Sequence, residues 1–276
     1  MTVQGIERIR EYLGEYKGNY VIIGGTATNI NLEDAALEGR VTHDIDMIMV
    51  CEAITPDYLA RFWEMIRAAG YEPAVIKTDT GVKRTFYRFV NPKDSTFPRY
   101  IELFCRVPDS IDVPEDMHLV HISSEDEYLS SFSAIMMDDD YYNFAVRHSV
   151  EMQGVQVLDK FALIVLKAKA YISNLARKES GNRVQSDDII KHKKDVYRLS
   201  FLLDETADRI SLTDTLKTDM RSFIETVRAH ELNTKALSNN MGVAEISQAD
   251  FLSKLATIFQ LCYDETPIRI RSSSGI

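Results

Sequence analysis

The feature that most constrains this chain is a strand-like run that ends in two glycines and is followed, further along, by two closely spaced aspartates. Residues 20–23 read Tyr-Val-Ile-Ile, the glycines are Gly24 and Gly25, and Asp44 and Asp46 flank one isoleucine. Glycines after a buried strand let the backbone approach a phosphate. Carboxylates at positions i and i+2 of a strand point to one face and can share a divalent metal ion. The pattern therefore predicts metal-assisted chemistry on a nucleotide.

Alternation along residues 40–49 indicates a strand with one polar and one apolar face. The polar face carries Arg40, Thr42, Asp44 and Asp46. A third acid, Glu102, repeats this alternation within residues 100–104. A carboxylate with apolar neighbours is costly to bury unless it meets a metal ion or a base. We therefore expect Glu102 to be a third metal ligand; the alternative is half-exposed strands whose acids simply meet water.

The periodicity predicts an α+β fold in two parts. Residues 1–157 are expected to form a mixed sheet with flanking helices, and residues 158–276 a helical region that packs against it and closes one side of a cleft. Expected strands cover 21–23, 42–50, 74–77, 83–90, 99–105, 118–122, 142–150 and 155–158. Expected helices cover 6–16, 32–37, 56–69, a stretch that begins after Asp159, 187–203, and two or three segments within 213–263. Asp138, Asp139 and Asp140 are expected to form a turn between strands.

Charge and composition narrow the choice of partners and compartment. The net charge of −10 argues against broad electrostatic affinity for nucleic acid. Residues 167–198 nevertheless hold nine Lys or Arg against four acids, which is typical either of a surface that faces polyphosphate or RNA or of two solvated helix faces. We expect a cytoplasmic protein without a membrane segment, because no apolar run approaches a membrane span and no signal-peptide core precedes the first helix. The three cysteines are expected to be reduced and largely buried.

The order of these elements resembles the polymerase-beta-like nucleotidyltransferase superfamily, and most closely the AbiEii-like nucleotidyltransferase toxins of abortive-infection systems. The matching segments are Gly-Gly-Thr-Ala at residues 24–27, Arg-Val-Thr-His-Asp-Ile-Asp at 40–46, a lysine in an apolar frame at 163–170, and Lys-Lys-Asp at 193–195. The third acid is a Glu where the superfamily commonly has an Asp. The resemblance covers residues 20 to about 203 and leaves 205–276 without a counterpart.

The resemblance implies a Mg²⁺-dependent enzyme that moves a nucleoside monophosphate from an NTP to a hydroxyl acceptor and releases pyrophosphate. It implies that Asp44, Asp46 and Glu102 are catalytic and hold two Mg²⁺ ions. It further implies a nucleotide-binding set that comprises Gly24, Gly25, Thr26, Arg40, Thr42, Lys167 and Asp195. The implied acceptor is the end of an RNA or tRNA, or a protein side chain, and the implied role is that of a toxin with an antitoxin partner.

Several roles stay open on the sequence alone. Arg40 either neutralises phosphate or pairs with Asp44. Lys167 and Lys169 point in roughly opposite directions on a helix, so only one can face the cleft, and the apolar frame favours Lys167 over a lysine that merely snorkels. Asp195 either orients that lysine, binds the acceptor, or is a helix-surface acid. The alternative function is a catalytically weak nucleotide-binding regulatory protein on the same fold.

Overall fold

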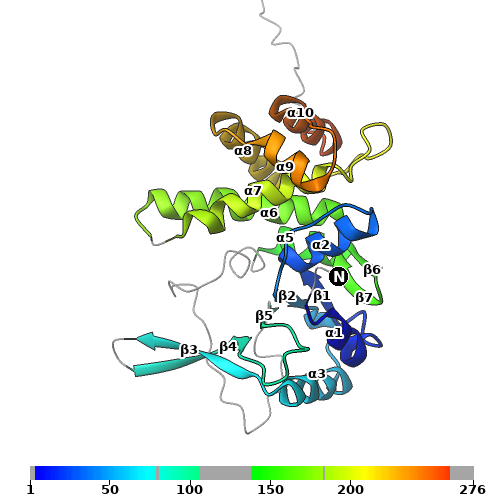
Figure 1. Ribbon diagram of the computed structural model, residues 1–276, viewed down its shortest axis with the longest axis vertical. Coiled ribbons are helices and arrows are strands. Elements are labelled where there is room, and N and C mark those ends of the chain that lie inside the picture. The colour runs from blue at the N-terminus through cyan, green and yellow to red at the C-terminus, as the bar shows by residue number, and fades with distance from the viewer. Residues whose placement is uncertain (1–3, 79–80, 106–137, 183, 262–276) are drawn as a thin grey trace, which may run out of the picture.

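The centre of the molecule is a seven-stranded mixed β-sheet with strand order β3-β4-β5-β2-β1-β7-β6 (Figure 1). The computed structural model describes residues 4–78, 81–105, 138–182 and 184–261, with the backbone alone at 73–78, 81–87 and 105. The strands are β1 Tyr20–Ile23, β2 Asp44–Met49, β3 Glu72–Thr78, β4 Gly81–Val90, β5 Tyr100–Cys105, β6 Ser149–Met152 and β7 Val155–Leu158. The α+β class expected from the sequence is therefore confirmed.

The pairing of the strands sets which side chains share a face. β1 is antiparallel to β2 and parallel to β7, whereas β2 and β5 are parallel. The remaining pairs, β3 with β4, β4 with β5 and β6 with β7, are antiparallel. Ile23 lies opposite Asp46, Asp46 opposite Glu102, and Glu102 opposite Arg88. These four residues form one cross-strand row, and their side chains project to the same face of the sheet.

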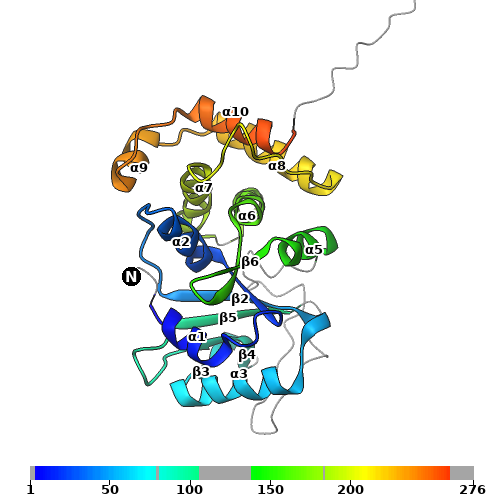
Figure 2. The same cartoon turned by 90° about the vertical axis from the view of Figure 1, so that its right-hand side faces the viewer.

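Helices cover both faces of this sheet (Figure 2). They are α1 Ile6–Leu13, α2 Gly24–Asp34, α3 Pro56–Ala69, α5 Asp139–Arg147, α6 Lys160–Glu179, α7 Ser186–Ser200, α8 Asp214–Ala229, α9 Thr234–Met241 and α10 Gln248–Ile258, with a 3-10 turn η1 at Cys51–Ala53. α1 and α3 lie on one side of the sheet, and α2 and α6 pack on the other. α5 and α7 pack beside α6, and α8, α9 and α10 form an outer layer.

Local signals explain where two of these helices begin and end. Thr55 caps α3 by accepting from the Tyr58 backbone N–H, Pro56 occupies the first turn, and Gly70 ends the helix at φ 67°. Asp159 caps α6 in the same way through the Ala162 N–H, as expected from the sequence. α6 is apolar on most sides because it lies between the sheet, α7 and α8.

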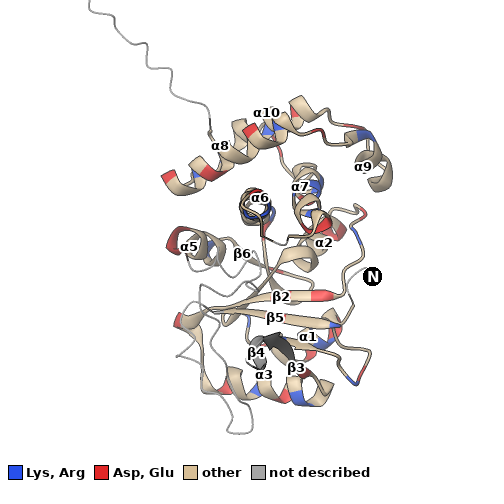
Figure 3. Cartoon of the chain, turned by 90° about the vertical axis from the view of Figure 1, so that its left-hand side faces the viewer, with Lys and Arg blue, Asp and Glu red and all other residues tan. Residues whose placement is uncertain are grey.

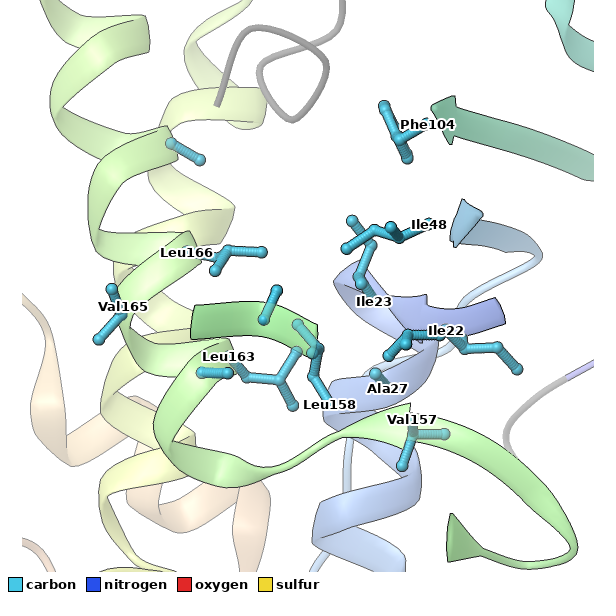
Figure 4. Packing of buried hydrophobic residues seen from close by; sticks show 14 of the residues in the cluster. Ile22, Ile23, Ala27, Ile48, Phe104, Val157, Leu158, Leu163, Val165 and Leu166 are labelled. Atoms are coloured by element: carbon cyan, nitrogen blue, oxygen red, sulfur yellow. The ribbon is translucent and has the colours of Figure 1, made fainter. Parts of the chain in front are cut away.

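The core fixes α6 on the sheet face that carries the acidic residues. Leu163 and Leu166 of α6 are buried and lie toward Ile23 and Ile48 of the central strands (Figure 4). Ile48 follows Asp46 by two residues on β2, so both side chains are on this face. Burying a leucine side chain contributes roughly 2 kcal/mol. The packing therefore places the helix that carries Lys167 above the row of acids.

Two expectations from the sequence are wrong. Residues 142–150, expected as a strand, form the end of helix α5 and part of β6. Asp138 is the N-cap of α5 and accepts from the Asp140 N–H, so the three aspartates begin a helix and do not form a turn between strands. Tyr141, Tyr142, Phe144 and Ala145 are buried at helical spacing, a pattern that a short aromatic run does not distinguish from a strand.

Helix α2 also differs from the expectation, because it begins at Gly24 directly after β1 and not near residue 32. The predicted strand at 118–122 lies outside the described residues. Beyond β7 the described chain is helical, and the buried side chains of sheet and helices form one continuous core. The predicted boundary at residue 157 stays a prediction. In the part of the chain that the structure describes, no helix is both long and apolar enough to cross a membrane.

Candidate functional site

The carboxylates predicted as metal ligands lie on adjacent strands. Asp44 and Asp46 share the upper face of β2, and Glu102 stands beside Asp46 on β5. Asp44 is exposed, whereas Asp46 and Glu102 are partly buried. Burial raises the pKa of Asp46 to about 7, with further contributions from the charges of Glu102 and Asp44. Surroundings that raise the pKa of a carboxyl group in this way favour the binding of a proton or a cation there.

Gly24 brings the Asp46 carboxylate against the start of helix α2. A Cβ atom at Gly24 would overlap Asp46 Oδ2, and the residue has a φ of 68°, which glycine adopts without strain. Thr28 Oγ1 donates to the Gly24 carbonyl at 2.8 Å and fixes this turn. The first backbone N–H groups of a helix have no partners within the helix and carry partial positive charge. The turn therefore places the Asp46 carboxylate beside the start of α2, where the backbone N–H groups have no partners within the helix.

Gly25, the second glycine, lies under Arg40. A Cβ atom there would come 2.6 Å from Arg40 Nη2 and 3.2 Å from Thr42 Oγ1. Asn29 Nδ2 donates to the Arg40 carbonyl. Thr26 Oγ1 donates to the Asp44 carbonyl at 2.6 Å and ties α2 to β2. These contacts hold the segment between α2 and β2 over the glycine turn, and they bring the predicted residues of 24–26 and 40–46 together.

Arg40 also reaches a buried ionic cluster between α6 and α7. Lys167 Nζ lies 2.7 Å from Asp195 Oδ2, Arg198 Nη1 lies 2.9 Å from Asp195 Oδ1, and Arg40 Nε lies 3.5 Å from Asp195 Oδ2. Lys167 is 1% exposed and Asp195 is 0% exposed. Asp195 is therefore not the helix-surface acid that the sequence left open, and the ion pair of Arg40 is with Asp195 and not with Asp44.

The pKa values in this cluster follow from the balance of burial and charge. Burial alone would raise the pKa of Asp195, but Lys167, Arg40 and Arg198 together outweigh it and hold this pKa at about 2. Burial lowers the pKa of Lys167, and Asp195 offsets part of this shift. Three cations thus share one carboxylate, which leaves two positive charges uncompensated within the cluster. Figure 3 shows the acidic start of β2 below basic residues on α7.

Two buried polar atoms at this place make no hydrogen bond in the described part of the chain. They are Arg40 Nε and Asn29 Oδ1. Buried polar groups are nearly always paired with protein, water or a ligand. Arg40 Nε faces Asp195 Oδ2 at 3.5 Å, and Asn29 Oδ1 lies against Gly39 in the connection between α2 and β2.

Lys169, the other lysine considered from the sequence, does not join the cluster. Its Nζ lies 2.8 Å from Asp219 on α8. Other basic side chains of residues 167–198 are also engaged locally: Lys191 with Asp188, Lys178 with Ser186, and Lys193 with the Glu231 carbonyl. This part of the chain therefore combines a buried cluster with helix-surface pairs.

Some members of the site were not identified from the sequence. Arg198 follows Asp195 by three residues, which is the spacing of a helical ion pair and was a usable signal. Arg88 pairs with Glu102, a contact that depends on strand register and left no local signal. His43, between Thr42 and Asp44, is exposed, and its Nδ1 lies 2.8 Å from Gln4 Oε1. Cys51 is half-buried and forms no disulfide, and its Sγ donates to the Met49 carbonyl at 3.7 Å; the other cysteine side chains lie outside the described residues.

The carboxylates fit a divalent cation only in part. Asp44 and Asp46 offer oxygen ligands of the kind that Mg²⁺ prefers, on one face and beside Gly24. Glu102 is engaged by Arg88. Within the described residues, no three side chains of His, Cys, Asp or Glu converge closely enough to hold a metal ion. The pair on β2 thus suits one cation, whereas Glu102 in this position does not complete a three-ligand site.

No family model, curated protein or solved structure matches this chain. The function is therefore proposed from the geometry of the site and from the sequence motifs.

Proposed function

We propose that this chain is a Mg²⁺-dependent nucleotidyltransferase that transfers a nucleoside monophosphate from an NTP to a hydroxyl acceptor. The observation that carries the proposal is the position of the glycine turn between charges of opposite sign. Gly24 touches Asp46 on one side, and Gly25 lies under Arg40 on the other. A metal-bound triphosphate has the matching polarity, with a cation next to a chain of anionic phosphates.

The buried cluster is suited to the phosphate tail. Lys167, Arg40 and Arg198 leave two positive charges after Asp195 is counted, and the α2 N-terminus adds backbone donors. Asp195 keeps Lys167 charged and directed by a 2.7 Å hydrogen bond. We assign Asp195 the role of a positioning residue and Lys167 and Arg40 the role of phosphate ligands.

The chemistry is a substitution at the α-phosphorus. The acceptor oxygen forms a bond to this atom, the bond from it to the bridging oxygen breaks, and pyrophosphate leaves with that electron pair while the hydroxyl proton passes to solvent. A Mg²⁺ ion held by Asp44 and Asp46 would neutralise charge on the phosphate oxygens. Thr26 ties α2 to β2 through the Asp44 carbonyl, and the side chains of Thr42 and Arg40 lie against Gly25.

The acceptor belongs to the proposal as an RNA end, including tRNA, or a protein side chain. Lys191 is paired with Asp188, whereas Lys178 and Lys193 donate to the Ser186 hydroxyl and the Glu231 carbonyl and keep their positive charges. A role as a toxin held in check by an antitoxin is proposed on the resemblance of the sequence motifs alone.

A transfer assay tests the function. Purified protein, Mg²⁺ and each α-labelled NTP are incubated with total RNA and, separately, with cell protein. Transfer is expected with wild type and is expected to fall by at least about 10²-fold in Asp44→Ala and in Lys167→Met, since each removes charge stabilisation at the phosphates. Lys169→Met is the matched control on the same helix and is expected to retain activity. Equal loss in both lysine variants would contradict the assigned role of Lys167.

A second candidate, a nucleotide-binding regulatory protein without efficient catalysis, is favoured by the engagement of Glu102 with Arg88. Measurable binding of Mg²⁺-NTP by wild type without label in any acceptor fraction would support this candidate over the enzyme.

A further inference from the structure

Arg88 belongs to the same cross-strand row as the acids of the site. It lies opposite Glu102 in the pairing of β4 with β5, and Glu102 lies opposite Asp46 in the pairing of β5 with β2. Neighbouring strands are about 4.8 Å apart, so Arg88 starts two such spacings, on the order of 10 Å, from Asp46 on the same face. An arginine side chain is long enough to bring its guanidinium next to Glu102, which lies between Arg88 and Asp46 in this row.

The guanidinium of Arg88 pairs with the Glu102 carboxylate. Arg88 Nη2 contacts Glu102 Oε1, and the two side chains are 47% and 19% exposed. Glu102 is thus the less exposed residue of the pair, and Arg88 lies on its solvent side. Because residues directly opposite in an antiparallel pair hold their side chains together, this contact is supported by the register of the sheet.

The charges of this row match one divalent cation. When the acids of the row and the neighbouring Asp44 are all ionised, Asp44, Asp46 and Glu102 carry three negative charges, and Arg88 carries one positive charge, which leaves two negative charges. The Glu102 charge is already balanced by its neighbour, so the two remaining charges are those of the β2 pair. A second divalent ion at Glu102 would have to displace a guanidinium that holds the same oxygen.

We propose that the site takes a single divalent cation at Asp44 and Asp46, and that Arg88, positioned by Glu102, is the fixed cation where a second metal ion would otherwise bind. This inference rests on the proposed function and replaces the two-ion site expected from the sequence resemblance. Arg88 then directs its remaining N–H donors toward the acceptor or the α-phosphate, and Glu102 is a positioning residue and not a metal ligand. A guanidinium stays charged throughout the physiological pH range, so this positive charge does not depend on Mg²⁺ concentration.

The test is the number of Mn²⁺ ions bound per chain, measured by electron paramagnetic resonance with a saturating, non-hydrolysable α,β-methylene NTP. We expect one Mn²⁺ in wild type and one in Glu102→Gln. Arg88→Gln frees the Glu102 carboxylate, and we expect it to bind a second Mn²⁺. The double variant Arg88→Gln/Glu102→Gln should return to one ion. Because Glu102→Gln is informative alone, the test stands even where the arginine variant fails to fold in a thermal-melting control.

Arg61→Gln is the matched control. Arg61 also forms an ion pair on the surface, with Glu64 at 2.6 Å, but it lies on α3 across the sheet from the site (Figure 2). Its loss should leave the count at one ion. Two ions in wild type and one in Glu102→Gln would overturn the inference and leave the proposed enzyme intact. No bound ion in wild type, with or without nucleotide, would overturn both.

Discussion

Asp46 and Asp195 lie on the two sides of one glycine turn, and their pKa values move in opposite directions. Burial disfavours the ionised form of both carboxylates. Asp46 has Glu102 and Asp44 as neighbours, and its pKa rises to about 7. Asp195, which is also buried, has Lys167, Arg40 and Arg198 as neighbours, and its pKa falls to about 2. Burial favours the protonated form of both carboxylates; the surrounding charges add to this effect at Asp46 and reverse it at Asp195.

The difference separates a binding role from a structural one. A carboxylate with a raised pKa is destabilised in its charged form and gains most from an incoming cation. A carboxylate with a lowered pKa is already satisfied and organises the groups around it. Asp46 is therefore suited to receive a ligand, and Asp195 to hold Lys167 and Arg40 in place for one.

The largest effect is expected from breaking the satisfied carboxylate. Asp195→Ala leaves Lys167 buried without its counter-ion, and we expect a loss of roughly 3–5 kcal/mol in the free energy of unfolding by urea denaturation. Asp188→Ala, which breaks an exposed pair on the same helix, should cost less than about 1 kcal/mol. Adding Lys167→Met to Asp195→Ala should recover part of the loss. A similar loss of unfolding free energy in Asp195→Ala and Asp188→Ala would contradict the structural role assigned to Asp195.

A smaller effect of opposite sign is expected at Asp46. Between the ordinary carboxyl pKa of 3.8 and about 7, the folded chain holds a proton at Asp46 that the unfolded chain has released. Stability should therefore fall as pH rises through this window and level off above it. A pKa unit corresponds to about 1.4 kcal/mol, and partial exposure reduces the effect, so we expect roughly 1–3 kcal/mol.

Asp46→Asn should remove this pH dependence and be more stable than wild type at pH 8 when both are unfolded in urea. Asp195 contributes in the other direction, because its stabilisation is lost only as pH falls from about 4 toward 2. An Asp46→Asn variant with the same slope as wild type between pH 4 and 7 would contradict the assigned environment.

The smallest effect concerns the turn between the two carboxylates. Gly24→Ala imposes a side chain at positive φ and drives a methyl group into Asp46 Oδ2. Gly181→Ala imposes a similar backbone strain, at φ 87°, in open space. We expect Gly24→Ala to cost roughly 1 kcal/mol more than Gly181→Ala in thermal or urea unfolding. It should also weaken Mn²⁺ binding, whereas equal costs and unchanged binding would show that Asp46 moves aside freely.

Many of the strands and helices could be predicted from the sequence because the signals that define them are local. The alternation of Asp44 to Met49, the Pro56 start and Gly70 end of α3, and the Asp159 cap each depend on a few adjacent residues. Helix α5 was missed because Tyr141 to Ala145 present aromatic and apolar residues that suit a strand as well as a helix.

The site divides in the same way. Gly24, Gly25, Asp44 and Asp46 follow from spacing along one segment. The burial of Asp195 and its three cations depends on how α6, α7 and the α2–β2 connection meet, which no local pattern specifies. Arg88 depends on the register between two strands. Contacts of this kind arise from tertiary packing, so single-sequence reasoning reaches the residues and not their partners.

The shared carboxylate of Asp195 has a consequence for how this sequence can vary over time. Lys167, Arg40 and Arg198 come from three separate parts of the chain, yet each depends on the same two oxygen atoms. Replacement of any one of them by an uncharged residue changes the charge balance around the other two. Drift at these four positions is therefore coupled, and related chains should exchange them together or leave them unchanged, with the swap of Lys167 and Asp195 as a linked pair the first to look for.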